Sequence, residues 1–188
     1  MVLPPFSVFV AIFYHGRSGE ICGNPAAGCI FFRRCALTVN FAYYDSPLGL
    51  IQIGYEGEAV VSIRRHQGKF QHIPSPVSEL ANSQLQEYFC GKRISFDLAL
   101  HPKGTPFQQA VWQALLDIPY GEVRTYGQIA AAIGKPKAAR AVGQAANRNP
   151  LWIVVPCHRV VGSCGKLTGY AGGLDLKQYL LKLEQTDT

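Results

Sequence analysis

The residues of this 188-residue chain best able to do chemistry follow an apolar run, Leu-Trp-Ile-Val-Val at residues 151–155. The run predicts a buried strand that Pro156 ends, with Cys157 immediately after it. His158 and Arg159 come next, and positive charge beside a thiol lowers its pKa and favours the nucleophilic thiolate. The sequence therefore indicates a reactive cysteine, with an inert buried thiol as the alternative.

Direct contact between the Cys157 and His158 side chains is not expected. Consecutive side chains of an extended chain point to opposite faces. A kink or a bridging water is therefore needed before the histidine can take the thiol proton.

A basic segment precedes the cysteine. Helices expected at residues 126–133 and 137–146 are joined by Gly-Lys-Pro, which is typical of a helix-turn-helix and also of helical hairpins in protein cores. In the second helix, Arg140 is a long basic side chain set among alanines, valine and glycine. It suits either phosphate contact or a solvated surface. The basic residues grouped here favour phosphate contact: Lys135, Lys137, Arg140 and Arg148.

The elements before this region predict a small α+β domain whose role is support. Three short strands are expected at residues 41–44, 48–55 and 59–65, with Ile51, Ile53 and Tyr55 on one face. A further strand is expected at residues 96–100. A helix over residues 76–89 has the apolar stripe Val77, Leu80, Ala81, Leu85, Tyr88 and Phe89.

The later part of the chain is mostly helical and has clearer boundary signals. Thr105 to Gln108 and Thr125 to Gln128 are capping patterns, each of which predicts a helix start. The first of these helices has the apolar stripe Phe107, Val111, Leu115 and Ile118. In the last helix, Glu184 shares a stripe with Leu176 and Leu180, where an unpartnered carboxylate is costly. The alternative for Glu184 is an exposed helix end.

Composition excludes several classes of protein. With 48% hydrophobic and 16% charged residues, the chain is neither disordered throughout nor a coiled coil, and no apolar run reaches the length of a membrane span. The net charge of +6 favours a polyanionic partner. The six cysteines are scattered without a CxxC pair, which suits a reducing compartment. We therefore expect a cytoplasmic protein, or a nuclear one in a eukaryote.

Residues 1–38 lack the periodicity of the rest and are expected to be an extension outside the fold. An extra ordered element and a targeting segment are the alternatives.

The hexapeptide Pro-Cys-His-Arg-Val-Val at residues 156–161 resembles the active-site motif of the O6-alkylguanine-DNA alkyltransferases, or methylated-DNA–protein-cysteine methyltransferases. The resemblance covers about residues 41–185. It also includes Thr125-Tyr-Gly, residues 138–143, Asn149-Pro and residues 169–173. It implies an α+β fold, with a small antiparallel-sheet, ribonuclease-H-like domain at residues 39–101 and a winged helix-turn-helix domain at residues 102–188.

The resemblance also implies a chemistry. Cys157 would accept the alkyl group from O6 of guanine, and from O4 of thymine, irreversibly and once per molecule. His158 would act as base through a bridging water, and Glu184 would orient it. Tyr126 would donate a proton to the flipped guanine, with a packing tyrosine as the alternative. Asn149 would tie the active-site turn together.

The same resemblance implies binding surfaces. The substrate pocket would be formed by Tyr126, Trp152, Val160, Tyr170, Ala171 and Gly172, with Ala171 where a serine is common. The DNA-binding residues would be Thr125, Tyr126, Ala138, Ala139, Arg140 and Arg148, with Arg140 filling the gap left by the extruded base.

The expected partner is double-stranded DNA, bound by a monomer in the minor groove with little sequence preference and without contact to a membrane. No cofactor is expected, and no metal: the N-terminal zinc site of some family members is not carried over to Cys22, Cys29 and Cys35. A non-catalytic winged-helix DNA-binding protein is the main alternative, and a cysteine hydrolase a remote one.

Overall fold

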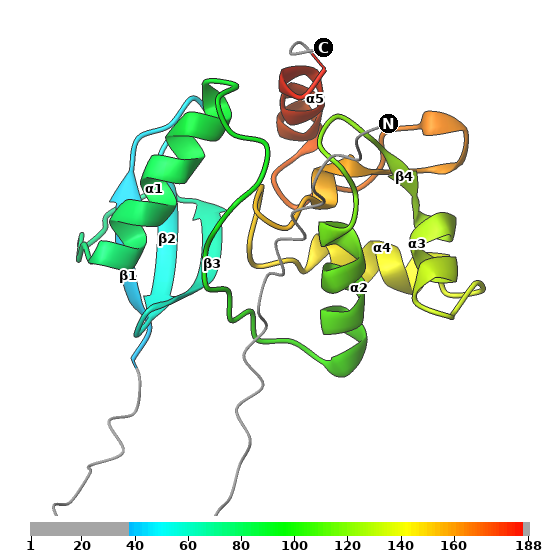
Figure 1. The fold of residues 1–188 in the computed structure, drawn as a ribbon, viewed down its shortest axis with the longest axis horizontal. Coiled ribbons are helices and arrows are strands. Elements are labelled where there is room, and N and C mark those ends of the chain that lie inside the picture. The colour runs from blue at the N-terminus through cyan, green and yellow to red at the C-terminus, as the bar shows by residue number, and fades with distance from the viewer. Residues whose placement is uncertain (1–37, 186–188) are drawn as a thin grey trace, which may run out of the picture.

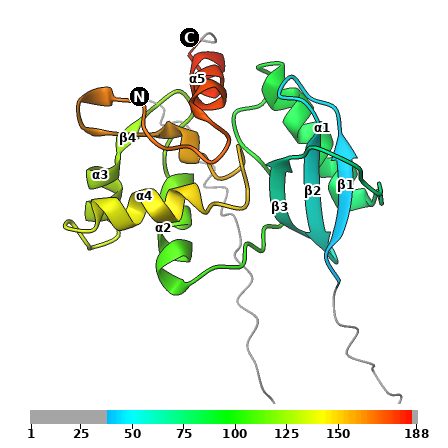
Figure 2. The same ribbon diagram turned by 180° about the vertical axis from the view of Figure 1, so that it is seen from behind.

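The computed structural model describes residues 38–185, which form an α+β fold with two parts (Figure 1). Apart from Thr38, the extension expected at residues 1–38 lies outside the described residues. A three-stranded sheet with one helix forms the first part, and four helices form most of the second (Figures 1 and 2). No helix within residues 38–185 is long and apolar enough to cross a membrane.

The first part contains the expected antiparallel meander. Its strands are β1 (Asn40–Tyr44), β2 (Ile51–Glu56) and β3 (Ala59–Arg65), in the order β1-β2-β3. Helix α1 (Pro76–Phe89) packs on the sheet and has the expected bounds. The stripe expected on α1 is wrong at Leu80, which is half exposed, whereas Ser78 and Gln84 are buried.

The strand expected at residues 96–100 is not formed. Asp97 pairs instead with the side chain of Gln84, whose amide donates to the Asp97 carbonyl at 2.9 Å and accepts from the Asp97 amide at 2.8 Å. These bonds satisfy the backbone groups that a strand would use in a ladder. Only Leu100 forms an isolated bridge, to Val60 of β3.

The second part contains helices α2 (Pro106–Leu116), α3 (Tyr126–Ala132), α4 (Ala139–Asn147) and α5 (Leu174–Leu183). Both expected capping boxes are present and start α2 and α3. The short strand β4 (Arg124–Thr125) pairs in parallel with β5 (Val160–Val161), which follows the cysteine. This pairing places the start of α3 beside the segment that leaves the expected active site.

The strand expected at residues 151–155 is also wrong, although the segment is buried. It folds into turns in which the Val155 amide donates to the Leu151 carbonyl at 3.0 Å and Ile153 has a φ of 73°. Leu151 bridges to Ile63 of β3 and so joins the two parts of the fold. The chain then enters a single 3-10 turn, η1 (Cys157–Arg159), rather than extended backbone.

Candidate active site around the buried cysteine

Cys157 begins the 3-10 turn and is 5% exposed. Burial raises the pKa of its thiol to about 11, and the opposing effects of a hydrogen bond from Asn149 and the charge of Lys177 are smaller. The expectation that Arg159 and His158 lower this pKa is therefore wrong. Arg159 turns away to Glu184, and burial keeps His158 neutral. The resting group is a thiol that needs a base.

Asn149 is 2% exposed and holds the turn that presents the cysteine. Its amide nitrogen donates to the Val155 carbonyl at 2.8 Å and to the sulfur of Cys157 at 3.2 Å, and its oxygen accepts from the Leu151 amide at 2.9 Å. These are the contacts required of a residue that ties the turn together. They also explain why residues 151–155 form turns rather than a strand. Asn149 satisfies the backbone groups of Leu151 and Val155 that a strand would pair with a neighbouring strand.

His158 and Glu184 form a buried pair. The Nε2 atom of His158 lies 2.8 Å from Oε1 of Glu184, and the residues are 0% and 3% exposed. Burial lowers the pKa of His158 and outweighs the opposing effect of Glu184, so the ring is neutral at pH 7. Because a carboxylate only accepts, Nε2 holds the proton and Nδ1 is the basic nitrogen. Nδ1 is buried and has no hydrogen-bond partner among the described residues.

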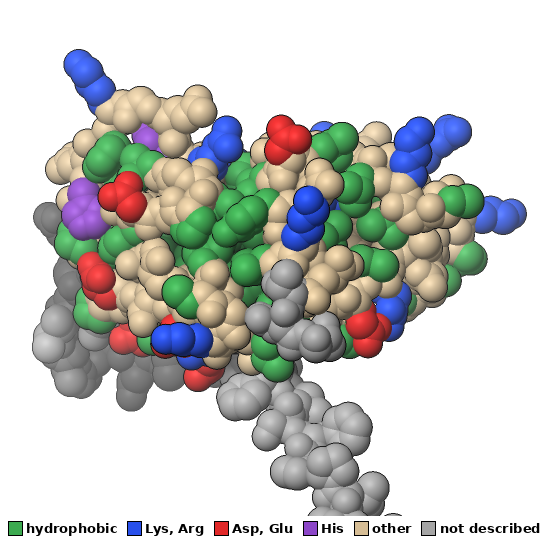
Figure 3. Space-filling model, turned by 90° about the horizontal axis from the view of Figure 1, so that it is seen from above, with side chains coloured by type: hydrophobic (Ala, Val, Ile, Leu, Met, Phe, Trp, Pro, Cys, Tyr) green, Lys and Arg blue, Asp and Glu red, His purple; other side chains and the backbone are tan. Residues whose placement is uncertain are grey.

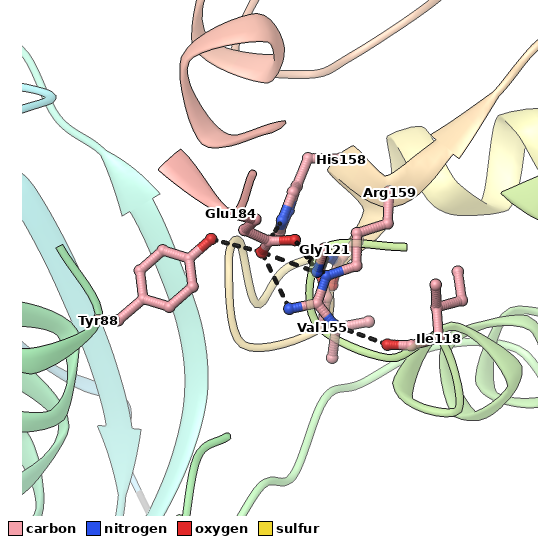
Figure 4. Close-up of polar contacts among 8 residues, drawn as sticks. Tyr88, Ile118, Gly121, Val155, His158, Arg159 and Glu184 are labelled. Atoms are coloured by element: carbon pink, nitrogen blue, oxygen red, sulfur yellow. Dashed lines mark hydrogen bonds and ion pairs between the residues drawn. The ribbon is translucent and has the colours of Figure 1, made fainter. Parts of the chain in front are cut away.

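Glu184 lies at the C-terminal end of α5 and accepts hydrogen bonds from four residues (Figure 4). Besides His158, the donors are the Arg159 guanidinium at 2.9 Å, the Tyr88 hydroxyl at 2.7 Å and the Gly121 amide at 3.2 Å. Burial alone would raise the pKa of Glu184, but His158 and Arg159 lower it to about 2. The exposed helix end considered as an alternative is excluded.

Of the residues expected in the substrate pocket, Tyr126 and Tyr170 lie close enough to Cys157 for its charge to raise their pKa values. The rings of Trp152 and Tyr170 lie 5.8 Å apart, and Gly172 packs against both, so that an added Cβ would lie 2.9 Å from Trp152 and 2.5 Å from Leu176. A larger residue would therefore have to displace the Trp152 ring and the Leu176 side chain. Val160 is buried in β5, whereas Ala171 is exposed.

Tyr126 is the first residue of α3, and its hydroxyl donates to the carbonyl of Thr168 at 3.1 Å. Burial raises its pKa, and the proximity of Cys157 adds to this effect. The hydroxyl therefore keeps its proton at neutral pH, which its expected role requires.

Lys177 belongs to the site but was not anticipated. It is fully buried, and its ammonium group donates to the carbonyls of Val160 and Thr168. Burial lowers its pKa, and Cys157 raises it. Helical spacing is the signal in the sequence that could have placed Lys177 in the site, because it shares one face of α5 with Leu180 and Glu184.

A cleft of about 740 Å³ lies between the start of α3, one face of α4 and the loop before α5. It is lined by Thr125, Tyr126, Ala139 and Arg140 of the expected DNA-binding set. Ala138 and Arg148, at the two ends of α4, are outside this lining. The missed lining residues of α4 follow Arg140 at helical spacing: Gly143, Gln144 and Asn147. In Figure 3, Lys and Arg side chains project from the end of the molecule where α3 and α4 meet.

Comparison with known proteins agrees with this geometry. A family model described as 6-O-methylguanine DNA methyltransferase, DNA binding domain, matches residues 106–186. A methylated-DNA–protein-cysteine methyltransferase of Methanosarcina acetivorans is 52% identical over 152 residues, which cover 77% of this chain and 97% of the relative.

Two solved structures from Mycobacterium tuberculosis have the same fold. Its O6-methylguanine methyltransferase is 45% identical, with a TM-score of 0.74 over 80% of this chain and 95% of that one. A complex of its OGT with DNA is 47% identical, with a TM-score of 0.71 over 78% of this chain and 92% of that one. This chain therefore belongs to the methylated-DNA–protein-cysteine methyltransferase family.

Proposed function

We propose that this protein repairs alkylated DNA by transferring the alkyl group from O6 of guanine, or from O4 of thymine, to the sulfur of Cys157. The observation that carries the proposal is the buried thiol joined to Asn149, beside a histidine whose carboxylate partner leaves Nδ1 as the free base. The relatives named above act on methylated DNA, and one was solved with DNA bound.

The transfer begins with loss of the thiol proton. Because burial keeps Cys157 protonated at neutral pH, Nδ1 of His158 takes the proton through a bridging water. The thiolate attacks the alkyl carbon, forming the S–C bond as the C–O6 bond breaks. Tyr126 donates its proton to the departing guanine, and the proton held by His158 returns to the tyrosinate through solvent.

The lesion must leave the base stack to reach this thiol. A nucleophile that is 5% exposed cannot approach O6 inside a duplex, so the nucleotide is extruded into the pocket beside Tyr126. We assign α3 and α4 as the helix-turn-helix and the β4–β5 pair with its following loop as the wing, with α4 placed in the minor groove. Arg140, exposed at the cleft, fills the gap in the stack.

Two further assignments complete the proposal. Residues 39–101 form a ribonuclease-H-like domain and residues 102–188 form the alkyltransferase domain. A monomer is proposed, and one chain is sufficient for it because it supplies every residue given a chemical role above.

Intact mass after incubation with a duplex carrying one O6-methylguanine tests the function. The expected result is a gain of one methyl group located on the peptide that contains Cys157. An unchanged mass together with tight duplex binding would instead support the non-catalytic DNA-binding protein.

Replacing Arg140 with Ala is expected to slow repair in duplex DNA about tenfold, because extruding a base costs a few kcal/mol that the inserted side chain offsets. Reaction with free O6-benzylguanine needs no extrusion and should stay within about twofold. Single-turnover rates on both substrates check this. Arg65→Ala, at an exposed position at the end of β3 in the other part of the fold, is the control and should change neither rate by more than about twofold. Equal losses of rate on both substrates would show instead that Arg140 stabilises the fold.

Binding to undamaged DNA is expected to weaken steeply with salt and to vary little with sequence. Phosphate contacts by Lys135, Lys137, Arg140 and Arg148, all exposed, predict a slope of about −3 to −4 for log K against log salt. Fluorescence anisotropy with unrelated duplexes measures both properties. A strong preference for one undamaged sequence would contradict the proposed repair role.

A further inference from the structure

The first part of the fold contributes one hydroxyl to the active-site network. Tyr88, near the end of α1, is 0% exposed, and its hydroxyl donates to Oε1 of Glu184 at 2.7 Å. The two residues are 96 positions apart in the sequence and come from different parts of the fold. Helical spacing alone predicts that Tyr88 packs in the core of the first part. The bond to Glu184 shows that this part also contacts the active-site network directly.

The oxygen that Tyr88 contacts is the one that faces the histidine. Oε1 of Glu184 accepts from the Tyr88 hydroxyl at 2.7 Å and from Nη2 of Arg159 at 2.9 Å, and it lies 2.8 Å from Nε2 of His158. Oε2 accepts from Nε of Arg159 and from the Gly121 amide. In Figure 4, Tyr88 approaches the carboxylate from the side opposite Arg159. Rotation of the carboxylate is thus opposed from both sides, by Tyr88 at the oxygen that faces the base and by Arg159 at both oxygens.

The position of Tyr88 is itself fixed by packing. Its ring centroid lies 5.6 Å from that of Phe96 in its own part and 6.1 Å from that of Tyr120 in the other. Burial raises the pKa of Tyr88 far above its ordinary value, and the negative charge of Glu184 acts in the same direction. The hydroxyl therefore stays protonated. Because Tyr88 has no exposed surface, bulk water does not reach Glu184 at this position to take the place of the hydroxyl.

We propose that Tyr88 is a positioning residue for alkyl transfer, through which the first part of the fold holds the carboxylate of Glu184 against His158. This inference rests on the proposed function. It gives the small α+β domain a share in the chemistry at Cys157, because the carboxylate that orients the base is held by donors from both parts of the fold.

Tyr88→Phe in the full chain tests the proposal, since phenylalanine keeps the ring packing and removes only the hydroxyl. Because a hydrogen bond to a charged group is stronger than one between neutral groups, its loss should lower the single-turnover rate on an O6-methylguanine duplex about tenfold. The final yield should remain one methyl per chain. Tyr55→Phe is the matched control: Tyr55 is buried in the same part, but its hydroxyl donates to the Ile73 carbonyl, and its loss should change the rate less than about twofold.

The pH dependence of the rate separates positioning from packing. The groups that act on the charge of His158 are Glu184, Arg159 and Lys177. Removing the Tyr88 donor leaves more negative charge on Oε1, so the pKa of His158 rises and the acid limb of the rate moves to higher pH. In a His158→Asn background, Tyr88→Phe should change the rate no further.

The outcomes are distinguishable. A Tyr88→Phe rate within twofold of wild type, a slower rate with an unmoved acid limb, or a further loss in the His158→Asn background would each overturn the role of Tyr88. Absence of methyl transfer by the wild-type chain would overturn the proposed function itself.

Discussion

Replacing Cys157 with Ser is expected to abolish methyl transfer to the protein while leaving binding to the O6-methylguanine duplex intact. A serine hydroxyl is far less ionised than a thiol at neutral pH and is a weaker nucleophile. It still accepts a hydrogen bond, so the bond from Asn149 that holds the turn is retained. The measurement is methyl transferred per chain, alongside duplex affinity.

The same measurement on the wild-type chain, with damaged duplex in excess, is expected to reach a plateau near one methyl per chain. The product is a thioether, and a neighbouring thiolate does not cleave an unactivated S–CH3 bond as it cleaves a disulfide. Cys90 and Cys164 are exposed free thiols, so Cys164→Ser is the control and should leave the plateau unchanged. Product formation well beyond one equivalent would refute single-use chemistry.

Glu184→Gln is expected to destabilise the fold by about 3–5 kcal/mol, because it leaves the buried guanidinium of Arg159 without its countercharge. Repair should slow about a hundredfold, since the base loses its orienting carboxylate. Urea unfolding and single-turnover rates measure the two effects. Glu122→Gln breaks an exposed pair with Arg124 and should cost less than about 1 kcal/mol. Equal losses for both variants would show that the network around Glu184 is not special.

The pH dependence of stability gives a second readout for Glu184. Its pKa falls from 4.5 to about 2 on folding, so its stabilising contribution is complete above pH 4.5 and is lost as the pH falls toward 2. The shift corresponds to about 3 kcal/mol. His158 acts in the same direction, because its lowered pKa makes protonation below about pH 6.5 unfavourable in the native state. Glu184→Gln should show a smaller loss of stability between pH 5 and 2 than the wild-type chain does.

Local signals in the sequence were reliable wherever the structure is decided by neighbouring residues. The capping boxes at Thr105 and Thr125 start their helices as expected, because their bonds close within three residues. The helix at residues 76–89 was predicted with the bounds it has, and the meander before it agrees to within a few residues. The hexapeptide at residues 156–161 identified the family that the relatives confirm.

Expectations failed where polar side chains hydrogen-bond the backbone groups that a strand would pair. The apolar composition of residues 151–155 predicted burial correctly, but composition alone does not distinguish a buried strand from a buried turn. The amide of Asn149 decided between them by bonding the backbone there. The side chain of Gln84, 13 positions away, likewise bonds both backbone groups of Asp97, and the strand expected at residues 96–100 does not form.

The sequence by itself indicated the candidate nucleophile, the histidine beside it and the helix stripe that contains Glu184, because residue type and helical spacing are local properties. Only the tertiary structure decided that Arg159 binds Glu184 rather than lowering the pKa of Cys157, and that Tyr88 reaches the same carboxylate from the other part of the fold. The physical reason is that a buried charge takes the best donors within reach in three dimensions, whatever their separation along the chain.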